Sequence, residues 1–270
     1  MSCHPALTET AVKNALHYDK EELCHHCDKC EKLTRLHAAS SLLRKKMKED
    51  LVSRYSFLAW EWFIYNEEAR KEFKVLLPGS LMSSSTLTVL MGYGTVSEWF
   101  KDATSRSCEI FEEQLKRGSF VVIGHGDCCT NMLFRYDAKE NPVEVLFLDF
   151  QLCRQASLAV DLNYFLFSNF DRKDRKEKMG QYLSLYHSSF AKVLASASLT
   201  MPYTIEEITK EFKRKNIYQI ICGSILIPLL VSETQELIDF DSASGGRAKN
   251  YVEELRQNAI RMRVRSIVLR

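Results

Sequence analysis

The chain has 270 residues, of which 46% are hydrophobic and 27% charged, as is ordinary for a globular protein with a sizeable core. Its formal net charge of +2 gives no reason to expect a nucleic acid or a membrane as a partner. The longest apolar stretch, residues 217–231, is too short to span a bilayer, and we predict a buried helix there. The N-terminal residues lack the pattern of a secretory signal and the nine cysteines are an odd number, so we predict reduced thiols and a cytoplasmic location.

Residues 1–118 are predicted to be mainly helical. Asp19 and Glu22 have the spacing of a capping box at a helix start. Downstream of this pair, apolar side chains recur at helical spacing as far as Leu43. The pattern predicts one long amphipathic helix.

Two further helices are predicted before the middle of the chain. The first covers the aromatic-rich residues 55–65, and the second covers residues 105–117 with Gly118 at the C-terminal cap position. Between them, residues 78–85 contain one proline, one glycine and four serines. Because these residue types favour turns, we predict a loop there.

A run of cysteines and histidines at residues 24–30 suggests a metal site, since thiolates and imidazoles at short spacing bind zinc. On the predicted helix, Cys24 and Cys27 share a face, but the two histidines of the run point elsewhere. No second Cys/His pair follows at ligand spacing. We therefore favour the packing of Cys27 and Cys30 in a helix–helix contact over a zinc site.

Residues 119–153 carry the strand patterns of the chain. A β-branched and aromatic run at residues 119–123 predicts one strand, and residues 132–136 and 143–148 predict two more. The segment 137–142 that joins the last two is rich in turn-forming residues. We therefore predict an antiparallel hairpin.

Polar groups suited to phosphoryl transfer lie at the ends of these strands. The first strand runs into His125-Gly126-Asp127, Asn131 follows, and the last strand ends at Asp149. Phosphoryl transfer needs a carboxylate that accepts the proton of the attacking hydroxyl and oxygen ligands that hold Mg²⁺ on the phosphates. We predict that the hairpin returns Asp149 to the side of Asp127.

The stretch VIGHGDCCTNMLFRYDAKENPVEVLFLDFQLCRQASLAVDLNYFLF, residues 122–167, resembles the catalytic segment of the ecdysteroid kinase-like family. That family, also called CHK kinase-like, is similar to choline kinases and aminoglycoside phosphotransferases. The resemblance extends more weakly to residues 36–40 and to the apolar segment and basic tail downstream. It implies a protein kinase-like fold and the use of ATP and Mg²⁺ to phosphorylate a hydroxyl on a small molecule, either steroid-like or amino-alcohol-like.

The resemblance also implies residue roles. Asp127 is the expected catalytic base, and Asp149 and Asn131 are the expected ligands of Mg²⁺ and, through it, of ATP. His125 is expected to brace the turn of its loop. Asp161 is expected to support the structure by capping the start of a helix.

Two departures from the family pattern set limits on the enzyme hypothesis. Only three residues, 128–130, separate Asp127 from Asn131, where the family has four, so the metal ligand has to be placed by a shortened loop. Neither a glycine-rich phosphate loop nor a strand lysine is recognisable upstream: Gly92 and Gly94 lie in a helix-like neighbourhood, and Lys74 is a poor substitute. We therefore expect only the large lobe of a kinase.

Residues 154–270 are predicted to be helical again, with Asp161 at the start of the first helix and further helices at 174–195, 205–214, 217–231 and 248–266. The fold class expected is α+β, mainly helical, around one small β-hairpin. Two functions remain open. The chain is an N-terminally truncated small-molecule kinase with weak or no activity, arising from a gene model, an isoform or a genuine single-lobe relative. Alternatively, it is an inactive kinase-like remnant that binds a ligand or a protein. The sequence gives no oligomeric state.

Overall fold

The computed structural model describes residues 25–230, except residues 48, 60, 130, 140 and 171, and omits the side chains of residues 25–29, 62, 63 and 227–230. The predicted capping box at Asp19 and the predicted helix at 248–266 lie outside the described residues. The chain forms two compact units. Unit 1 contains the chain up to residue 60 together with residues 117–215, and unit 2 contains residues 61–116 together with the chain from residue 216.

Unit 1 contains two small antiparallel sheets. Strand β2 (Met132–Tyr136) pairs with β3 (Pro142–Phe147), which confirms the predicted hairpin. Strand β1 (Val121–Gly124) pairs with β4 (Arg154–Ser157), a strand that the sequence did not predict. The four residues of β4 contain no β-branched or aromatic side chain, so only the tertiary pairing with β1 reveals it.

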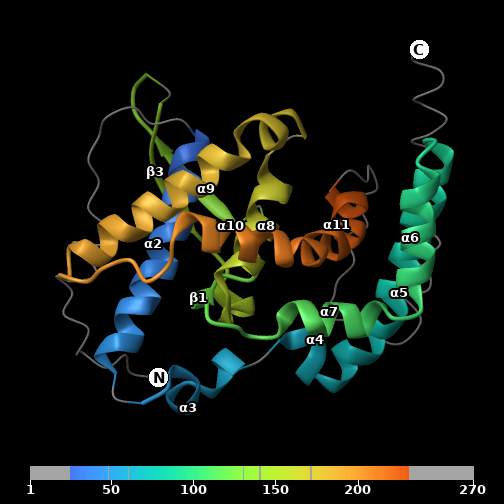
Figure 1. Ribbon diagram of the computed structural model, residues 1–270, viewed down its shortest axis with the longest axis horizontal. Coiled ribbons are helices and arrows are strands. Elements are labelled where there is room, and N and C mark those ends of the chain that lie inside the picture. Colours follow the sequence, from blue (N-terminus) through green and yellow to red (C-terminus); the bar gives the residue numbers. More distant parts are fainter. Residues whose placement is uncertain are drawn as a thin grey trace. The chain divides into compact units, whose positions relative to one another are not determined.

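Helices make up most of the described part of the chain, and in unit 1 helix α2 lies beside β1 and β3 (Figure 1). The long helix predicted near the N-terminus is confirmed in its described part as α2, which packs along α9. Helix α10 begins at a capping box formed by Thr204 and Glu207. The helical segments of unit 1 are α2 (His25–Lys46), α3 (Leu51–Arg54), η1 (Ser56–Ala59), η2 (Phe150–Leu152), α8 (Leu158–Asn169), α9 (Arg172–Ala195) and α10 (Ile205–Arg214).

Helix α2 is fixed to both of its neighbours by polar contacts. Its Ser40 hydroxyl accepts a hydrogen bond of 2.9 Å from the backbone N–H of Ile123, and the Arg44 guanidinium donates to the carbonyl of Val121 over 2.8 Å. On the side of α9, the buried Cys30 thiol lies 3.8 Å from the carbonyl oxygen of Tyr182. The prediction that Cys30 packs between helices is therefore confirmed, whereas the side chain of Cys27 lies outside the described residues.

Helix α8 forms the centre of unit 1, because each of the nine residues 158–166 is buried. A helix that is buried on every side belongs to a core and shows no polar face. The helix starts at Ser157, whose hydroxyl accepts a hydrogen bond from the backbone N–H of Ala159. The prediction that Asp161 caps this helix is wrong: Asp161 lies within its first turn and its carboxylate is used elsewhere.

Unit 2 is built from α4 (Trp62–Tyr65), α5 (Glu67–Leu90), α6 (Gly94–Thr104), α7 (Ser107–Leu115) and α11 (Asn216–Leu230). The predicted core helix at 217–231 is confirmed as α11, which packs against α5 and α7 with Tyr218 and Ile221 buried. The Tyr218 ring stacks on that of Phe111 in α7, with 5.7 Å between the ring centroids.

The loop predicted at residues 78–85 is wrong, because α5 runs through the whole segment with Pro78 inside it. Buried Leu76, Leu77 and Leu81 hold the helix against its neighbours, so packing outweighs the local cost of the proline. The Ser83 hydroxyl donates a hydrogen bond of 3.0 Å to the carbonyl oxygen of Gly79, one turn earlier in the same helix. By length and composition α5 also reaches the range of a membrane span, a criterion that core helices of soluble proteins meet as well.

Two other helix boundaries differ from the prediction. Helix α7 ends at Leu115 with Lys116 in the capping position, so Gly118 is not the cap. The aromatic stretch at 55–65 is divided among η1, α4 and a connection, and it is not one helix. Phe57 and Tyr65 are 59% and 61% exposed, so these rings lack the packing that would extend the helix.

Candidate active site

The loop after β1 is held by the carboxylate of Asp161, which is buried in α8. The backbone N–H of His125 donates to one carboxylate oxygen, and that of Gly126 donates to the other over 3.0 Å. Asp161 approaches closely because Gly124 has no side chain: a Cβ atom there would lie 2.9 Å from the nearer carboxylate oxygen. The loop conformation is therefore fixed from beneath by one side chain.

Gly126 is required in this loop for two reasons. Its φ of +85° lies in the left-handed region that favours glycine. A Cβ atom at this position would also lie 2.2 Å from the carbonyl oxygen of Leu152, which is backbone and has little freedom to move. The glycine of the His-Gly-Asp motif is thus explained by the backbone of the loop and the segment next to it.

Asp161 also receives a hydrogen bond from α2. His37 Nε2 lies 3.2 Å from Asp161 Oδ2, and His37 Nδ1 lies 2.7 Å from the hydroxyl of Tyr186 in α9. Burial by itself raises the pKa of Asp161, but His37, Arg154 and the His125 N–H together lower that pKa to about 2. Burial raises the pKa of Tyr186 well above its ordinary value, so this residue stays a neutral phenol.

The side chain of His125 braces the loop to which it belongs. Its Nε2 lies 2.9 Å from the carbonyl oxygen of Leu148, and its Nδ1 lies 3.3 Å from the backbone N–H of Asp127. A carbonyl only accepts and an N–H only donates, so both contacts are satisfied by the neutral ring with its proton on Nε2. The fully buried ring also packs against Phe147 and Phe150, at centroid distances of 5.0 and 4.7 Å.

The carboxylate of Asp127 is oriented by two donors. The hydroxyl of Tyr164 in α8 donates to Oδ1 over 2.6 Å, and the amide nitrogen of Asn131 donates to Oδ2 over 3.0 Å. The same Asn131 nitrogen lies 3.0 Å from the Asp127 carbonyl oxygen. The shortened loop therefore still brings Asn131 against Asp127. The contact is made by the amide nitrogen of Asn131, and the amide oxygen is not part of it.

Tyr164 was missed in the sequence. It lies in an apolar run that indicated only a core helix, and the buried side chain looks there like any other core aromatic. The one available signal was its spacing of three residues from Asp161, which places both side chains on one face of a helix.

The residue before Asp149, Leu148, connects the Asp149 segment to this loop through hydrogen bonds of its backbone groups. The backbone N–H of Leu148 donates to the Asn131 carbonyl over 2.9 Å, while the Leu148 carbonyl accepts from His125. Asp149 itself is exposed and has a left-handed backbone with φ of 57°, and its carboxylate accepts from the N–H of Gln151 over 3.4 Å. The structure thus brings the backbones of the His-Gly-Asp loop and of the Asp149 segment together.

The groups present are suited to Mg²⁺. Asp149 offers an accessible carboxylate, and Asn131 offers an amide oxygen. Mg²⁺ is usually bound by one or two carboxylates together with water and substrate phosphates. Within residues 25–230, as far as they are described, no group of three or more His, Cys, Asp or Glu side chains is arranged around a metal position. Any Mg²⁺ here would therefore depend on phosphate oxygens for part of its coordination.

Cys128 in this loop is not suited to nucleophilic chemistry. Cys128 is fully buried, and burial raises its pKa well above the ordinary value, so the thiol is not ionised. Its sulfur lies 3.9 Å from the Asp161 carbonyl oxygen, and the Asn169 amide donates to the Cys128 carbonyl oxygen over 3.1 Å. Cys128 therefore packs the loop onto α8.

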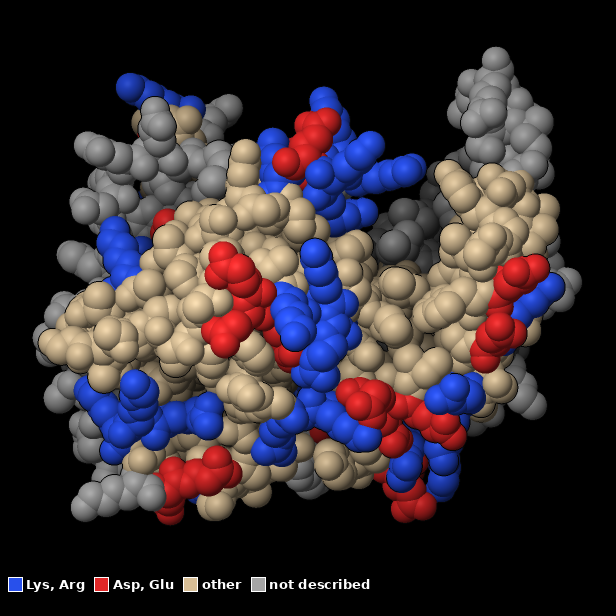
Figure 2. Space-filling view, viewed as in Figure 1, with Lys and Arg blue, Asp and Glu red and all other residues tan. Residues whose placement is uncertain are grey.

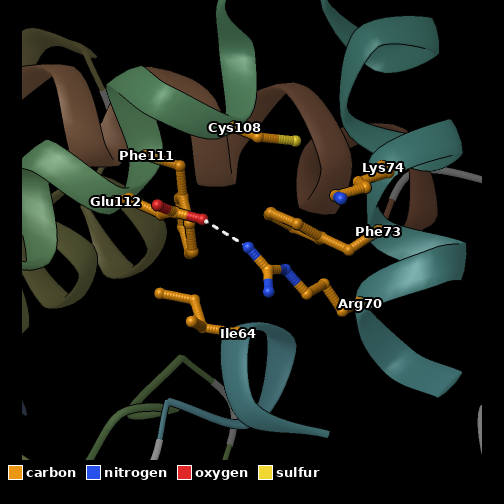
Figure 3. A pocket seen from close by; sticks show the side chains of 7 residues that line it. All are labelled: Ile64, Arg70, Phe73, Lys74, Cys108, Phe111 and Glu112. Carbon is orange, nitrogen blue, oxygen red and sulfur yellow. Dashed lines mark ion pairs between the residues drawn. The ribbon is translucent and has the colours of Figure 1, made fainter. Parts of the chain in front are cut away.

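Unit 2 contains a small internal cavity that is no substrate site. Its volume is about 10 Å³, which is room for a single water molecule. Arg70 and Glu112 lie at its edge with 3.6 Å between their charged groups (Figure 3). Burial raises the pKa of the Cys108 thiol at this cavity. The residues that line it are Ile64, Arg70, Phe73, Lys74, Cys108, Phe111 and Glu112.

Replacing Gly126 with alanine is predicted to destabilise the protein. The added Cβ meets the Leu152 carbonyl and the backbone is strained, so we expect the free energy of unfolding to fall by about 1–3 kcal/mol. The matched control is Gly180→Ala in α9, where nothing lies within 4 Å of the added atom and helix propensity predicts a gain of about 0.5–1 kcal/mol. Urea unfolding measures both, and an equal change in the two variants would contradict this account of the loop.

Asp161 is predicted to make stability depend on pH in the acid range. Its pKa of about 2 in the folded protein lies below the ordinary value of 3.8, so the ionised form stabilises the fold. This contribution of about 2 kcal/mol is complete above pH 4 and disappears as the pH falls towards 2. Asp161→Asn lacks it, so the stability difference between parent and variant should shrink between pH 5 and pH 2.5 in urea titrations. A constant difference would show that Asp161 does not titrate there.

A family comparison supports what the motifs and the geometry indicate. The profile of the ecdysteroid kinase-like family matches residues 13–199, which cover both strand pairs, the loop from His125 to Asn131 and helix α8. Searches of curated proteins and of solved structures found no match. Since the matched region is well over half of the chain, this protein belongs to the ecdysteroid kinase-like family.

Proposed function

We propose that this chain is an ATP- and Mg²⁺-dependent phosphotransferase that acts on a hydroxyl of a small molecule in the cytoplasm. Unit 1 would be the phosphotransfer part of a kinase-like large lobe. The observation that carries the proposal is the placement of Asp127: the carboxylate is oriented by Tyr164 and Asn131, and the segment of Asp149 is hydrogen-bonded to the same loop. Membership of the family supports phosphotransfer in general.

Asp127 would act as the base. In the reaction, the oxygen of the acceptor hydroxyl forms a bond to the γ-phosphorus of ATP, the bond from that phosphorus to the bridging oxygen breaks, and ADP leaves. The hydroxyl proton passes to Asp127. A carboxylate accepts about four hydrogen bonds, so the single bonds from Tyr164 and Asn131 leave lone pairs for the substrate on both oxygens.

Asp149 and Asn131 would hold Mg²⁺. When bound, the ion neutralises the charge that the phosphate oxygens carry in the transition state. Asp149 is suited to this role because it is exposed, and Asn131 because its amide nitrogen is held by Asp127.

An exposed apolar surface next to Asp149 supports a nucleotide as the phosphate donor. Leu133 and Leu146 lie opposite each other in the β2–β3 pairing and are 56% and 47% exposed, and Leu148 immediately precedes Asp149. Apolar side chains that stay exposed next to a polar site are typical of ligand-binding surfaces. The planar base of ATP is a group of matching chemistry, with its phosphates directed to the metal ligands.

An inactive, ligand-binding remnant is the second candidate. The observation that favours it is the small extent of β-structure, because the sheets formed by the described residues have two strands each. Removing one electrostatic donor costs about 10²–10³ in rate. We therefore propose slow transfer by the 270-residue polypeptide on its own.

The first prediction for this function is slow phosphate transfer that depends on Asp127. The purified chain, incubated with γ-labelled ATP and a set of steroid and amino-alcohol acceptors, should label a small-molecule product slowly. Asp127→Ala should lower that rate by about 10²–10⁴, the usual contribution of a catalytic base. The matched control is Asp102→Ala, an exposed carboxylate in α6. Label that does not depend on Asp127 would favour the remnant, and rapid turnover by the parent would contradict slow transfer.

A second prediction concerns Mg²⁺ binding. Mg²⁺ together with ADP should raise the melting temperature of the parent protein only slightly, because the phosphates of ADP are weakly anchored. Asp149→Asn should remove more of this stabilisation than Asn131→Ala, since the carboxylate is the charged ligand. Thermal-shift titrations of both variants measure the difference. Equal losses would mean that the shortened loop places Asn131 fully on the metal, and no effect in the parent would favour the remnant.

A further inference from the structure

The turn between α5 and α6 presents apolar side chains within a long uncharged segment. Residues 75–97, which include this turn, contain no Asp, Glu, Lys, Arg or His. Four large apolar side chains around the turn are each about half exposed, namely Val89, Met91, Tyr93 and Val96. An exposed group of this kind, continuous with an uncharged segment, is unusual on a surface that faces only water.

The backbone of the turn is satisfied internally. The N–H of Met91 donates to the Leu87 carbonyl over 3.0 Å, that of Gly92 to Val89 over 2.9 Å, and that of Tyr93 to Thr88 over 2.8 Å. Gly92 closes the turn with φ of +84°. An apolar medium provides no hydrogen-bond partners for backbone groups. A turn whose backbone groups are paired internally can therefore enter such a medium at low cost in free energy.

Four hydroxyl groups near the turn, those of Ser85, Thr86, Thr88 and Ser97, take part in hydrogen bonds within the protein. Thr88 donates to the carbonyl of Ser84 over 2.8 Å, and Thr86 to that of Met82 over 3.2 Å. Ser85 and Ser97 join α5 to α6 through a hydroxyl–hydroxyl contact of 2.8 Å. These groups do not need water as a partner, so the segment is effectively more apolar than its composition of serine and threonine indicates.

The charged residues of α5 lie away from the turn, whereas on α6 the exposed Glu98 follows Val96 by two residues. Arg70, Lys71 and Lys74 on α5 are accompanied there by Glu67, Glu68 and Glu72, so basic and acidic groups balance. In Figure 2 the end of α5 and α6 near their connection is free of drawn charge, and acidic and basic side chains appear further along the helices. The arrangement gives no electrostatic preference for an anionic partner.

We propose that the α5–α6 turn is a membrane contact that inserts Val89, Met91, Tyr93 and Val96 into the boundary between the headgroups and acyl chains of a neutral bilayer. Helix α6 starts without a side-chain cap, so its first N–H groups would meet the phosphate and ester oxygens of lipids at that depth. A second copy or another protein fits less well, because stable protein interfaces bury about 800 Å² on each side and this patch is four side chains at one turn. The inference is independent of phosphotransfer, and it departs from the sequence-based expectation of no membrane partner.

Vesicle binding tests the proposal. The full chain should float with phosphatidylcholine vesicles, and Met91→Asp should lower its partition coefficient by at least about tenfold, because an apolar contact is replaced by a charge. The matched control is Phe57→Asp in η1 of unit 1, an equally exposed apolar side chain whose loss should leave partitioning unchanged. Failure of the parent to bind, or equal losses in both variants, would overturn the proposal. A dimer in sedimentation velocity that only Met91→Asp dissociates, without vesicle binding, would also overturn it in favour of self-association.

A depth measurement provides a second, independent readout. Tyr93→Trp keeps an aromatic side chain in the turn, and its fluorescence should be quenched by vesicles of brominated phosphatidylcholine, whereas that of Phe57→Trp should not. Adding phosphatidylserine should not strengthen binding, because no basic residue lies beside the turn and the nearest charge is that of Glu98. Quenching that is the same in both variants, or binding that requires the anionic lipid, would contradict a contact made by this turn.

Discussion

The structure of the candidate site depends on one buried carboxylate. Asp161 accepts the backbone N–H groups of His125 and Gly126 and is itself held by His37 from α2. An unpaired charge at this depth is costly, so the carboxylate is stable only while all three donors are in place. Helices α2 and α8 and the loop after β1 are thereby required to pack together, and the loop has one conformation because Asp161 accepts two of its N–H groups at once.

The position of Asp127 follows from the way in which Asp161 holds the loop. With the loop fixed from beneath, His125 is positioned to join Asp127 to Leu148, and the Leu148 backbone brings the Asp149 segment to Asn131. Tyr164 completes the arrangement by donating to Asp127 from the same helix that carries Asp161. The proposed chemistry therefore needs no flexible element to assemble the base and the metal ligands. The proposed low rate rests on the small extent of β-structure in the described residues, whose sheets have two strands each.

The sequence was most informative where local pattern and tertiary role agree. The hairpin and the helices α9, α10 and α11 followed from β-branched runs and helical spacing. Residues 78–85 were misjudged because turn-forming residues there are outweighed by buried leucines, which no local rule weighs. The role of Asp161 was assigned to helix capping because its partners His37 and Gly126 are distant in sequence. Tyr164 was missed because its partner Asp127 is also distant in sequence, and β4 forms only through its pairing with β1.

A double-mutant cycle between His37 and Asp161 tests the central claim most directly. The free energies of unfolding of the parent, His37→Ala, Asp161→Ala and the double variant give the coupling between the two side chains at neutral pH. If Asp161 depends on His37 as described, the double variant loses less than the sum of the single variants, with a coupling of about 1–3 kcal/mol. Additivity within about 0.5 kcal/mol would contradict the account, because the carboxylate would then be stable without its partner.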